Sequence, residues 1–475
     1  MDAMETQAIV LAGGIDKQDF FPLCCAGGTP KALVSLGNVP LLHYPLRTLA
    51  QAGFKHAFVV VSGEDAAASI RDWISTEYAA KGTNLKCEVV AVPEGCGTAD
   101  ALRAVAHRIA SHSFVVLPGD LVTDVAVAAL VASHQMQGAL ASVTLVPRKI
   151  SPASETKPGK VPRGVDYVGM DPSRERLLYY AASRESLRDL KLPMSLIRQH
   201  GAMAICSNLT DAHLYVFSRQ VLSILEGQRT LTSLSQDVLP YLTQQQLKLR
   251  PQRTAILRAS SGFFNDEVMH ASSSSSENML PREPSVARPL PGDRYMDLSH
   301  CETAGSGAPA DTTNSGLMRV NVVDPGCNYC ARVVDVQAYG DVSREVADPA
   351  TALHLTGHRP SRYDNVVAAS AVLGTKTTVA AACIVGEGCT LGDKSSIKRS
   401  VLGRDVTLGA NVKVINSVLM DGSSVGDGCT IQNSILCEGV VLREKASLKD
   451  CQIGAGYVVA GGVEYKGEVL AKGAK

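Results

Sequence analysis

Residues 385–409 read VGEGCTLGDKSSIKRSVLGRDVTLG, and this stretch decides how the C-terminal part of the chain folds. Aliphatic residues stand at Val385, Leu391, Ile397 and Leu402, so the steps are six, six and five residues and the phase returns after 17. A period of six is neither the 3.6 residues of an α-helix nor the two residues of a simple strand. The rhythm continues to Val459 and indicates a coil of three short strands per turn, each pointing one aliphatic residue inward.

Glycine directly follows many of these aliphatic residues, as at Gly386, Gly392 and Gly403. We expect each such glycine to occupy a corner of the coil, where it adopts backbone angles that other residues avoid. Coils of this kind stack into a parallel β-helix, and the repeat resembles the left-handed hexapeptide-repeat helix.

Length and charge limit the classes of function. The chain has 475 residues, enough for two or three domains, and its 46 basic and 46 acidic residues balance. A neutral chain offers no overall field for nucleic acid or for a membrane surface. We find no signal-peptide pattern and no apolar run of about 18 residues, and the 13 cysteines form no paired framework. These features favour a cytosolic protein without direct nucleic-acid or membrane binding.

The N-terminal half alternates short apolar runs with helical patterns. The expected strands are residues 8–11, 58–61, 88–92, 114–117 and 141–146, and the expected helices are residues 41–52, 66–79, 99–110 and 125–137. This β-α alternation predicts an α/β domain with a parallel, doubly wound sheet. Ligands of such sheets bind at the carboxyl ends of the strands.

Residues with suitable chemistry cluster at those strand ends. Paired glycines after the first strand allow a backbone loop to approach phosphates, a lysine after proline supplies a cation, and an aspartate after a strand is suited to Mg²⁺. Each feature alone is more often structural than functional, as a turn, a solvated lysine or a helix cap. His213 and Tyr215 lie in an alternating strand pattern, and we expect their side chains to pack in the sheet. The candidate binding residues are Gly13, Gly14, Lys31, Gly97, Thr98 and Asp120.

Taken together and in this order, these motifs resemble the sugar-phosphate nucleotidyltransferase family, which often joins such a domain to a left-handed β-helix. The resemblance covers about residues 6–260 and 365–462. Active members carry Gly-Gly-x-Gly-x-Arg in the phosphate loop, whereas this chain has Asp16 in place of the third glycine and Gln18 in place of arginine. Losing a charge-assisted donor to phosphate costs about 1.5–3 kcal/mol, and Asp16 adds repulsion. We therefore expect a vestigial nucleotide site, no catalytic residues and loss of transferase activity.

Three further stretches, residues 93–103, 208–217 and 235–242, resemble the gamma subunits of eukaryotic translation initiation factor 2B. The related epsilon subunits continue into a helical-repeat domain that performs exchange, whereas this chain ends at Lys475, soon after the last coil. The resemblance implies a non-catalytic scaffold and regulatory subunit of the complex that recycles initiation factor 2 from its GDP to its GTP form. It implies the epsilon, beta, delta and alpha subunits and initiation factor 2 as partners, and no cofactor or metal.

Two alternatives involve enzymes. A GDP-mannose or ADP-glucose pyrophosphorylase would use Lys31 for phosphate and Asp120 for a metal, but Asp16 and Gln18 argue against it. A hexapeptide-repeat acyltransferase would need a histidine at a coil corner, and residues 365–475 contain none.

We expect four segments. Residues 1–264 form the nucleotidyltransferase-like domain, 317–364 a connecting segment and 365–475 the left-handed β-helix. Residues 265–316 are rich in Ser, Pro and Gly and show no apolar period, which predicts a disordered insertion.

Overall fold

A computed structural model describes residues 6–13, 20–24, 29–148, 165–182, 192–200, 202–246 and 317–471. These residues belong to one compact unit. The predicted insertion at 265–316 lies outside the described residues, as do Gly14, Asp16 and Gln18 of the phosphate loop. No helix in the described part of the chain is long and apolar enough to cross a membrane.

The N-terminal domain is built on a seven-stranded sheet with the order β13-β8-β12-β6-β1-β4-β5. All its strands run in one direction except β12, which is antiparallel to both of its neighbours. The sheet is therefore mixed: the predicted parallel, doubly wound arrangement is present, with β12 as its one antiparallel strand. The strands are β1 (Gln7–Leu11), β4 (His56–Ser62), β5 (Lys86–Val92), β6 (Ser113–Pro118), β8 (Ala141–Pro147), β12 (Leu209–Ser218) and β13 (Met318–Val322).

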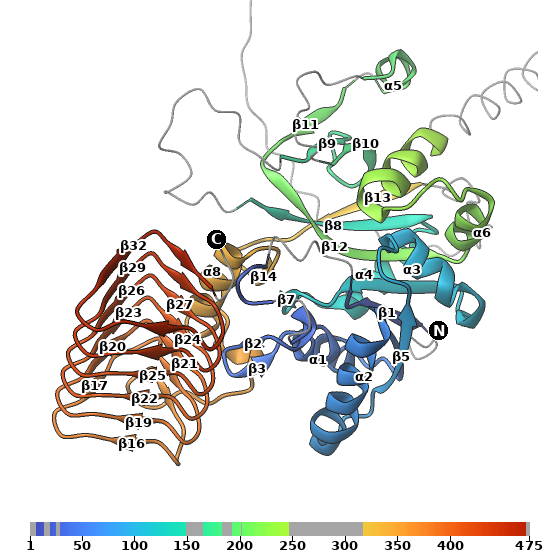
Figure 1. The fold of residues 1–475 in the computed structure, drawn as a ribbon. Helices are drawn as coiled ribbons and strands as arrows, with labels where there is room; N and C mark the ends of the chain where they lie inside the picture. Colours follow the sequence, from blue (N-terminus) through green and yellow to red (C-terminus); the bar gives the residue numbers. More distant parts are fainter. Residues whose placement is uncertain are drawn as a thin grey trace, which may run out of the picture. The chain divides into compact units, whose positions relative to one another are not determined.

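Helices cover both faces of this sheet, as the doubly wound prediction requires (Figure 1). Alternate residues of β1 point to opposite faces, so Ile9 packs in the core with α3 and α6, and Val10 packs with α1, α2 and α4. Each strand and helix expected in residues 8–146 is present within a few residues of its predicted bounds. The helices are α1 (His43–Gln51), α2 (Glu64–Trp73), α3 (Thr98–Val105), α4 (Val127–Met136) and α6 (Gln220–Gly227).

Smaller elements surround this sheet. A three-stranded antiparallel sheet has the order β10-β9-β11, and β2 pairs with β3 in a short hairpin. The bounds are β2 (Ser35–Leu36), β3 (Val39–Pro40), β9 (Tyr167–Met170), β10 (Leu177–Ala181), β11 (Ala204–Cys206) and α5 (Met194–Gln199). Single turns of helix occur at Lys31–Leu33, Ile74–Tyr78, Ala79–Lys81, Ala106–Arg108, Leu234–Val238 and Leu353–Leu355.

The segment that connects the two domains returns to the first one before it enters the second. Its strand β13 extends the large sheet beside β8, and β14 (Cys330–Arg332) pairs antiparallel with β7 (Leu121–Thr123). The helix α8 (Val336–Val346) follows, with the Asp335 side chain accepting from Ala338 N as its N-cap.

The C-terminal domain is a parallel β-helix of three ladders with seven, six and six strands, in the pattern of the predicted left-handed β-helix (Figure 1). The first ladder is β15 (Val366–Val367), β18 (Ile384–Val385), β21 (Val401–Leu402), β24 (Val418–Leu419), β27 (Ile435–Leu436), β30 (Gln452–Ile453) and β33 (Val469–Leu470). The second is β16 (Val372–Leu373), β19 (Thr390–Leu391), β22 (Thr407–Leu408), β25 (Ser424–Val425), β28 (Val441–Leu442) and β31 (Val458–Val459). The third is β17 (Thr378–Val379), β20 (Ser396–Lys398), β23 (Lys413–Ile415), β26 (Thr430–Gln432), β29 (Ser447–Lys449) and β32 (Glu464–Lys466).

The aliphatic repeat forms the core of the β-helix. Val385 pairs in register with Leu402, and Leu402 with Leu419, so residues 17 apart lie above one another. From Val385 to Val459 the predicted inward residues are buried together. Leu373 is 48% exposed because its strand, β16, is the end strand of its ladder and has only β19 beside it.

The glycines that follow the inward residues are required for a different reason from the one expected. A Cβ atom at Gly386 would lie 2.2 Å from the carbonyl oxygen of Gly403 in the next coil, so the close approach of stacked backbones excludes a side chain. The left-handed backbone angle occurs two residues later, at Gly388 (φ 69°), Lys394 (φ 59°) and Asp405 (φ 53°). The prediction that the first glycine supplies the unusual angle was therefore wrong.

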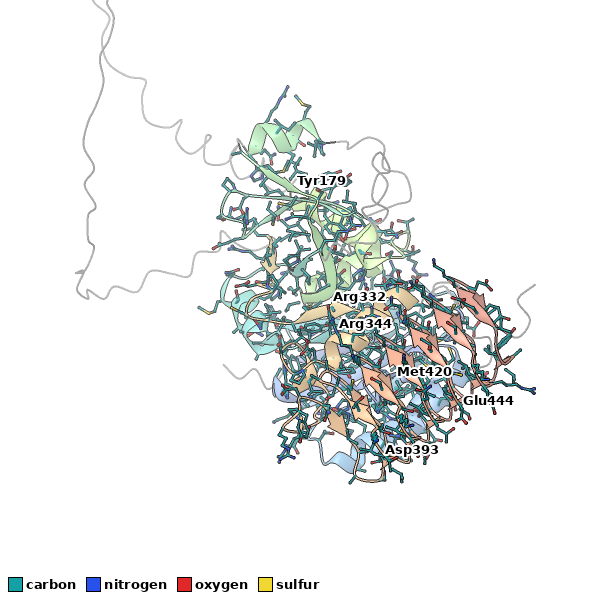
Figure 2. The ribbon with its side chains drawn as sticks, turned by 90° about the vertical axis from the view of Figure 1, so that its left-hand side faces the viewer. Tyr179, Arg332, Arg344, Asp393, Met420 and Glu444 are labelled. Carbon is teal, nitrogen blue, oxygen red and sulfur yellow. The ribbon has the colours of Figure 1, made fainter. Side chains whose placement is uncertain are left out.

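Outward residues of the first ladder pack on the connecting segment. Ile384, Val401, Val418 and Ile435 are buried in a cluster that includes Tyr339 of α8. Two side-chain hydrogen bonds add to this contact: Asn38 donates to Leu402 O (2.9 Å), and Arg344 donates to Asn416 O (3.2 Å). Arg344 is labelled in Figure 2. The β-helix is thus held to the first domain by apolar packing on α8.

Candidate functional site

Asp120 lies at the carboxyl end of β6 and binds two cationic side chains. Its Oδ2 atom is 2.8 Å from Lys31 Nζ and 3.2 Å from Arg332 Nη2, and its Oδ1 atom is 3.1 Å from Arg332 Nε. Asp120 is only 5% exposed. The structure thus brings together two of the predicted site residues, Lys31 and Asp120, with a third residue that the sequence had not singled out as part of the site.

Backbone pairing explains how Arg332 reaches Asp120. Strand β7 begins directly after Asp120, and Arg332 of β14 pairs with Leu121 of β7. Val333 N also donates to Asp120 O (3.0 Å). Lys31 approaches from the turn of helix at Lys31–Leu33, where its Nζ atom also lies 4.6 Å from the centre of the Phe20 ring.

The charges in this cluster stabilise one another. Burial alone would raise the pKa of Asp120, but Arg332 and Lys31 outweigh burial and lower that pKa to about 2. Burial lowers the pKa of Lys31, although Asp120 opposes this effect. For Arg332 the attraction of Asp120 outweighs burial, so its pKa is raised. The Asp120 carboxylate is ionised at neutral pH, and both of its oxygens bind the charged side chains of Lys31 and Arg332.

These residues do not fit a divalent cation. Mg²⁺ requires oxygen ligands in nearly octahedral geometry, whereas both oxygens of Asp120 accept hydrogen bonds from cationic nitrogens. Among the described residues, no group of three or more His, Cys, Asp or Glu side chains is arranged to hold a metal ion.

A second buried carboxylate, Asp211 of β12, lies within the electrostatic reach of Arg332. Its Oδ2 atom accepts from the hydroxyls of Tyr180 (3.1 Å) and Tyr215, and its Oδ1 atom accepts from His213 N (2.8 Å). Burial raises the pKa of Asp211 to about 6, even though the hydrogen bond from Tyr215 opposes this shift. Asp211 is therefore partly protonated near neutral pH.

His213 and Tyr215 differ in their surroundings. Tyr215 is 1% exposed and packs in the core of the sheet, as predicted. His213 lies where the register of β12 and β8 shifts, and its φ of 56° takes it out of the strand alternation. Burial and the charge of Arg332 lower the pKa of His213 well below its usual range, so this ring is neutral.

Gly13, Gly97 and Thr98 line one small pocket, together with Ser62 and Cys96. The space it encloses is about 10 Å³, roughly that of one water-sized sphere. A Cβ atom at Gly13 would lie 2.4 Å from Ser62 N, and one at Gly97 would lie 2.2 Å from Thr232 O. Close packing therefore accounts for both glycines.

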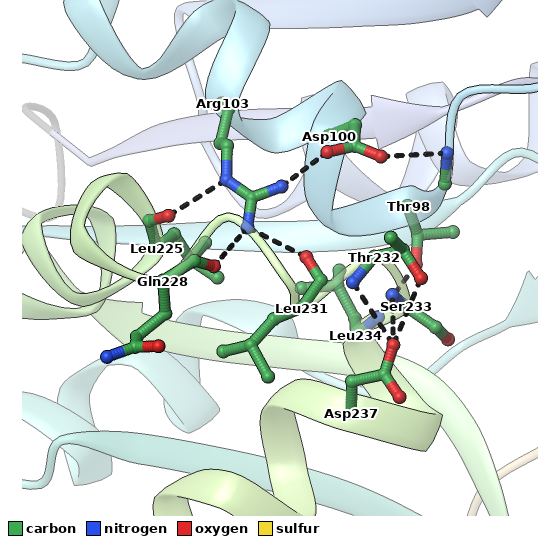
Figure 3. Close-up of polar contacts among 11 residues, drawn as sticks. Thr98, Asp100, Arg103, Leu225, Gln228, Leu231, Thr232, Ser233, Leu234 and Asp237 are labelled. Atoms are coloured by element: carbon green, nitrogen blue, oxygen red, sulfur yellow. Dashed lines mark hydrogen bonds and ion pairs between the residues drawn. The ribbon is translucent and has the colours of Figure 1, made fainter.

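The N-terminus of α3 is capped by the loop before Leu234–Val238 (Figure 3). Ala99 N donates to Thr232 O (2.9 Å), and Thr98 Oγ1 accepts from Leu234 N (2.8 Å). Gly97 N lies 3.3 Å from the Asp100 carboxylate. An amide group and a hydroxyl that could have faced a phosphate are thus used inside the protein.

Arg103 of α3 binds the end of α6 and the loop that follows it (Figure 3). Its Nε atom donates to Leu225 O (2.8 Å), and its Nη2 atom donates to Gln228 O and Leu231 O (both 2.7 Å). Its Nη1 atom forms an ion pair with Asp100. The stretch 93–103, which carried part of the sequence resemblance, is therefore clamped to residues 225–234.

Sequence reasoning missed the role of Arg332. More than 200 residues separate Arg332 from Asp120 along the chain. No spacing rule links the two positions. Gly14 was predicted for the same site and lies outside the described residues.

Comparisons with known proteins identify both domains. Residues 7–156 match the family model described as "Nucleotidyl transferase", and residues 362–465 match the one described as "EIF2B subunit epsilon LbH domain". Translation initiation factor eIF2B subunit gamma of Schizosaccharomyces pombe is 30% identical over 244 residues, which are 51% of this chain and about half (52%) of that relative. The subunit of the same name in Dictyostelium discoideum is 25% identical over 390 residues, or 79% and 82%.

An enzyme is also among the relatives. Mannose-1-phosphate guanylyltransferase catalytic subunit beta of Drosophila melanogaster is 26% identical over 241 residues, covering 51% of this chain and 55% of the relative. The Dictyostelium gamma-subunit match covers 79% of the chain against 51% for the enzyme. The resemblance to eIF2B gamma subunits that was recognised in the sequence is confirmed.

Proposed function

We propose that this chain, a homologue of eIF2B gamma subunits with a nucleotidyltransferase domain and a β-helix, is a non-catalytic scaffold and regulatory subunit of eIF2B. In this role it works in the cytosol with the epsilon subunit and with the beta, delta and alpha subunits, and the complex returns initiation factor 2 from its GDP to its GTP form. The observation that carries the non-catalytic part is the engagement of Asp120 by Lys31 and Arg332.

Three features support the loss of transferase chemistry. The carboxylate best placed for a metal is held by two side-chain cations, and the Ala99 amide at the start of α3 donates to Thr232 O. The phosphate loop carries Asp16 and Gln18 where active relatives of the family carry Gly and Arg. Phosphoryl transfer depends on positioning and on stabilising negative charge, and each feature weakens one of these contributions.

The β-helix supports a scaffold role. Its coils are joined by short parallel ladders around one continuous aliphatic core, which makes a rigid rod. Its second ladder presents Val372, Val441 and Val458, which are 63%, 37% and 51% exposed. Such a rigid, partly apolar face is suited to lateral contact with another protein.

Co-expression with epsilon, followed by an exchange assay, tests this proposal. We expect the two chains to elute together and the pair, added to the remaining subunits, to accelerate GDP release from initiation factor 2. Omitting this chain should lower the yield of assembled complex. Normal assembly and exchange without it would contradict the proposal.

The second candidate is a sugar-phosphate nucleotidyltransferase, and the likeness to a mannose-1-phosphate guanylyltransferase favours it. Incubating the chain with GTP and mannose 1-phosphate, or with ATP and glucose 1-phosphate, distinguishes the two. We expect no release of pyrophosphate above the blank. Release that disappears in Asp120→Ala would establish the enzyme instead.

A further inference from the structure

The three charged groups at Asp120 form an enclosed set. The side chains of Lys31, Asp120 and Arg332 are 14%, 6% and 18% exposed. Three donor nitrogens approach the two carboxylate oxygens at 2.8, 3.1 and 3.2 Å, so each oxygen has at least one cationic partner. A metal ion could reach these oxygens only if one of the cations moved away.

The charge of the set is also informative. One ammonium and one guanidinium group together carry the charge of a divalent cation, and both act on the same carboxylate. Unlike a bound ion, these two cationic groups are covalently attached to the chain. The pairing of β14 with β7 positions Arg332 beside Asp120. The planar guanidinium binds through two nitrogens, the geometry that suits a carboxylate.

We propose that Lys31 and Arg332 replace a divalent cation on Asp120, so that this site is closed to metal ions and instead fastens the connecting segment to the first domain. Arg332 is a positioning residue in this arrangement. Its guanidinium neutralises Asp120, and its backbone neighbour Val333 donates to Asp120 O. The inference does not depend on the proposed role in eIF2B, because it concerns the metal preference of the chain itself.

Mn²⁺ binding to the full-length chain tests this proposal, with the free ion measured by electron paramagnetic resonance. We expect the wild type and Asp120→Asn to bind Mn²⁺ equally weakly. Removing the guanidinium should open the site, so Arg332→Ala should bind about one Mn²⁺ per chain more tightly than the wild type. The double variant Arg332→Ala/Asp120→Asn should lose that gain. Arg71→Ala, which removes an exposed arginine paired with Glu64, is the matched control and should behave as the wild type.

Thermal unfolding gives an independent readout. The midpoint for the wild type should be the same in EDTA and in Mn²⁺. Arg332→Ala should lower the midpoint by on the order of 10 °C in EDTA, because a buried carboxylate loses a partner, and Mn²⁺ should restore part of the loss.

Two results would overturn the inference. One is the binding of a Mn²⁺ ion to the wild-type chain that is lost in Asp120→Asn. This comparison does not use Arg332→Ala, so it tests the inference even if that variant does not fold. The other is a folded Arg332→Ala protein that gains no Mn²⁺ binding.

Discussion

Replacing Arg103 with alanine should strongly destabilise the first domain. Arg103 donates three hydrogen bonds to main-chain carbonyls, and its side chain is only 16% exposed. The bonds to Leu225 O and Leu231 O are partly buried, and each contributes about 1.5–2 kcal/mol because the donor is charged. The exposed bond to Gln228 O and the ion pair with Asp100 add at most about 1 kcal/mol together. The free energy of unfolding should therefore fall by about 3–5 kcal/mol.

Urea unfolding followed by tryptophan fluorescence measures this effect. Trp73 is the single tryptophan of the chain, it is buried on α2, and it reports on the first domain rather than on the β-helix. Arg71→Ala is the control, because Arg71 forms an ion pair with Glu64 in which both side chains are well exposed. That control should change stability by less than about 1 kcal/mol. Equal midpoints for Arg103→Ala and Arg71→Ala would refute the structural role of the clamp.

Three further predictions concern the same domain. Gly97→Ala should cost about 1–3 kcal/mol, because the new Cβ would lie 2.2 Å from Thr232 O, whereas Gly227→Ala enters open space and should be neutral or slightly stabilising in the same urea assay. The pKa of Asp211 is raised to about 6 in the folded state, so its contribution to stability is full well below pH 3.8 and is lost as the pH rises through 6. The stability of the wild type relative to Asp211→Asn should therefore fall by about 2–3 kcal/mol from pH 3.8 to 7. A constant difference over this pH range would contradict the prediction. Lys31→Ala should leave nucleotide exchange by the assembled complex nearly unchanged, since Arg332 still binds Asp120; a large loss of exchange in an intact complex would show that the pocket is in use.

The repetitive parts of the fold were predictable because their signals are local. Each coil repeats the same aliphatic positions, so the period of 17 residues gave the register directly. In four successive strands of the first ladder the residue before the inward position is also apolar, at Ile384, Val401, Val418 and Ile435, whereas Gln452 occupies that place in the next strand. That α8 covers this outward row is shown only by the structure.

Long-range features were not predictable from the same patterns. The antiparallel direction of β12 depends on the chain's path through the small sheet, which no periodicity records. Asp120 could be assigned to a strand end and Lys31 to a Pro-Lys motif, and the two side chains do contact each other. Arg332 reaches them through a pairing between strands far apart in sequence. The reason for the corner glycines was missed because it arises from stacking between coils.

The proposed membership of eIF2B is tested most directly by purifying the tagged full-length chain from its own cells and identifying the proteins that accompany it by mass spectrometry. We predict stoichiometric recovery of the epsilon subunit, with the beta, delta and alpha subunits and initiation factor 2. Recovery of this chain alone or as a homo-oligomer, with none of these proteins, would contradict the proposal and favour the nucleotidyltransferase.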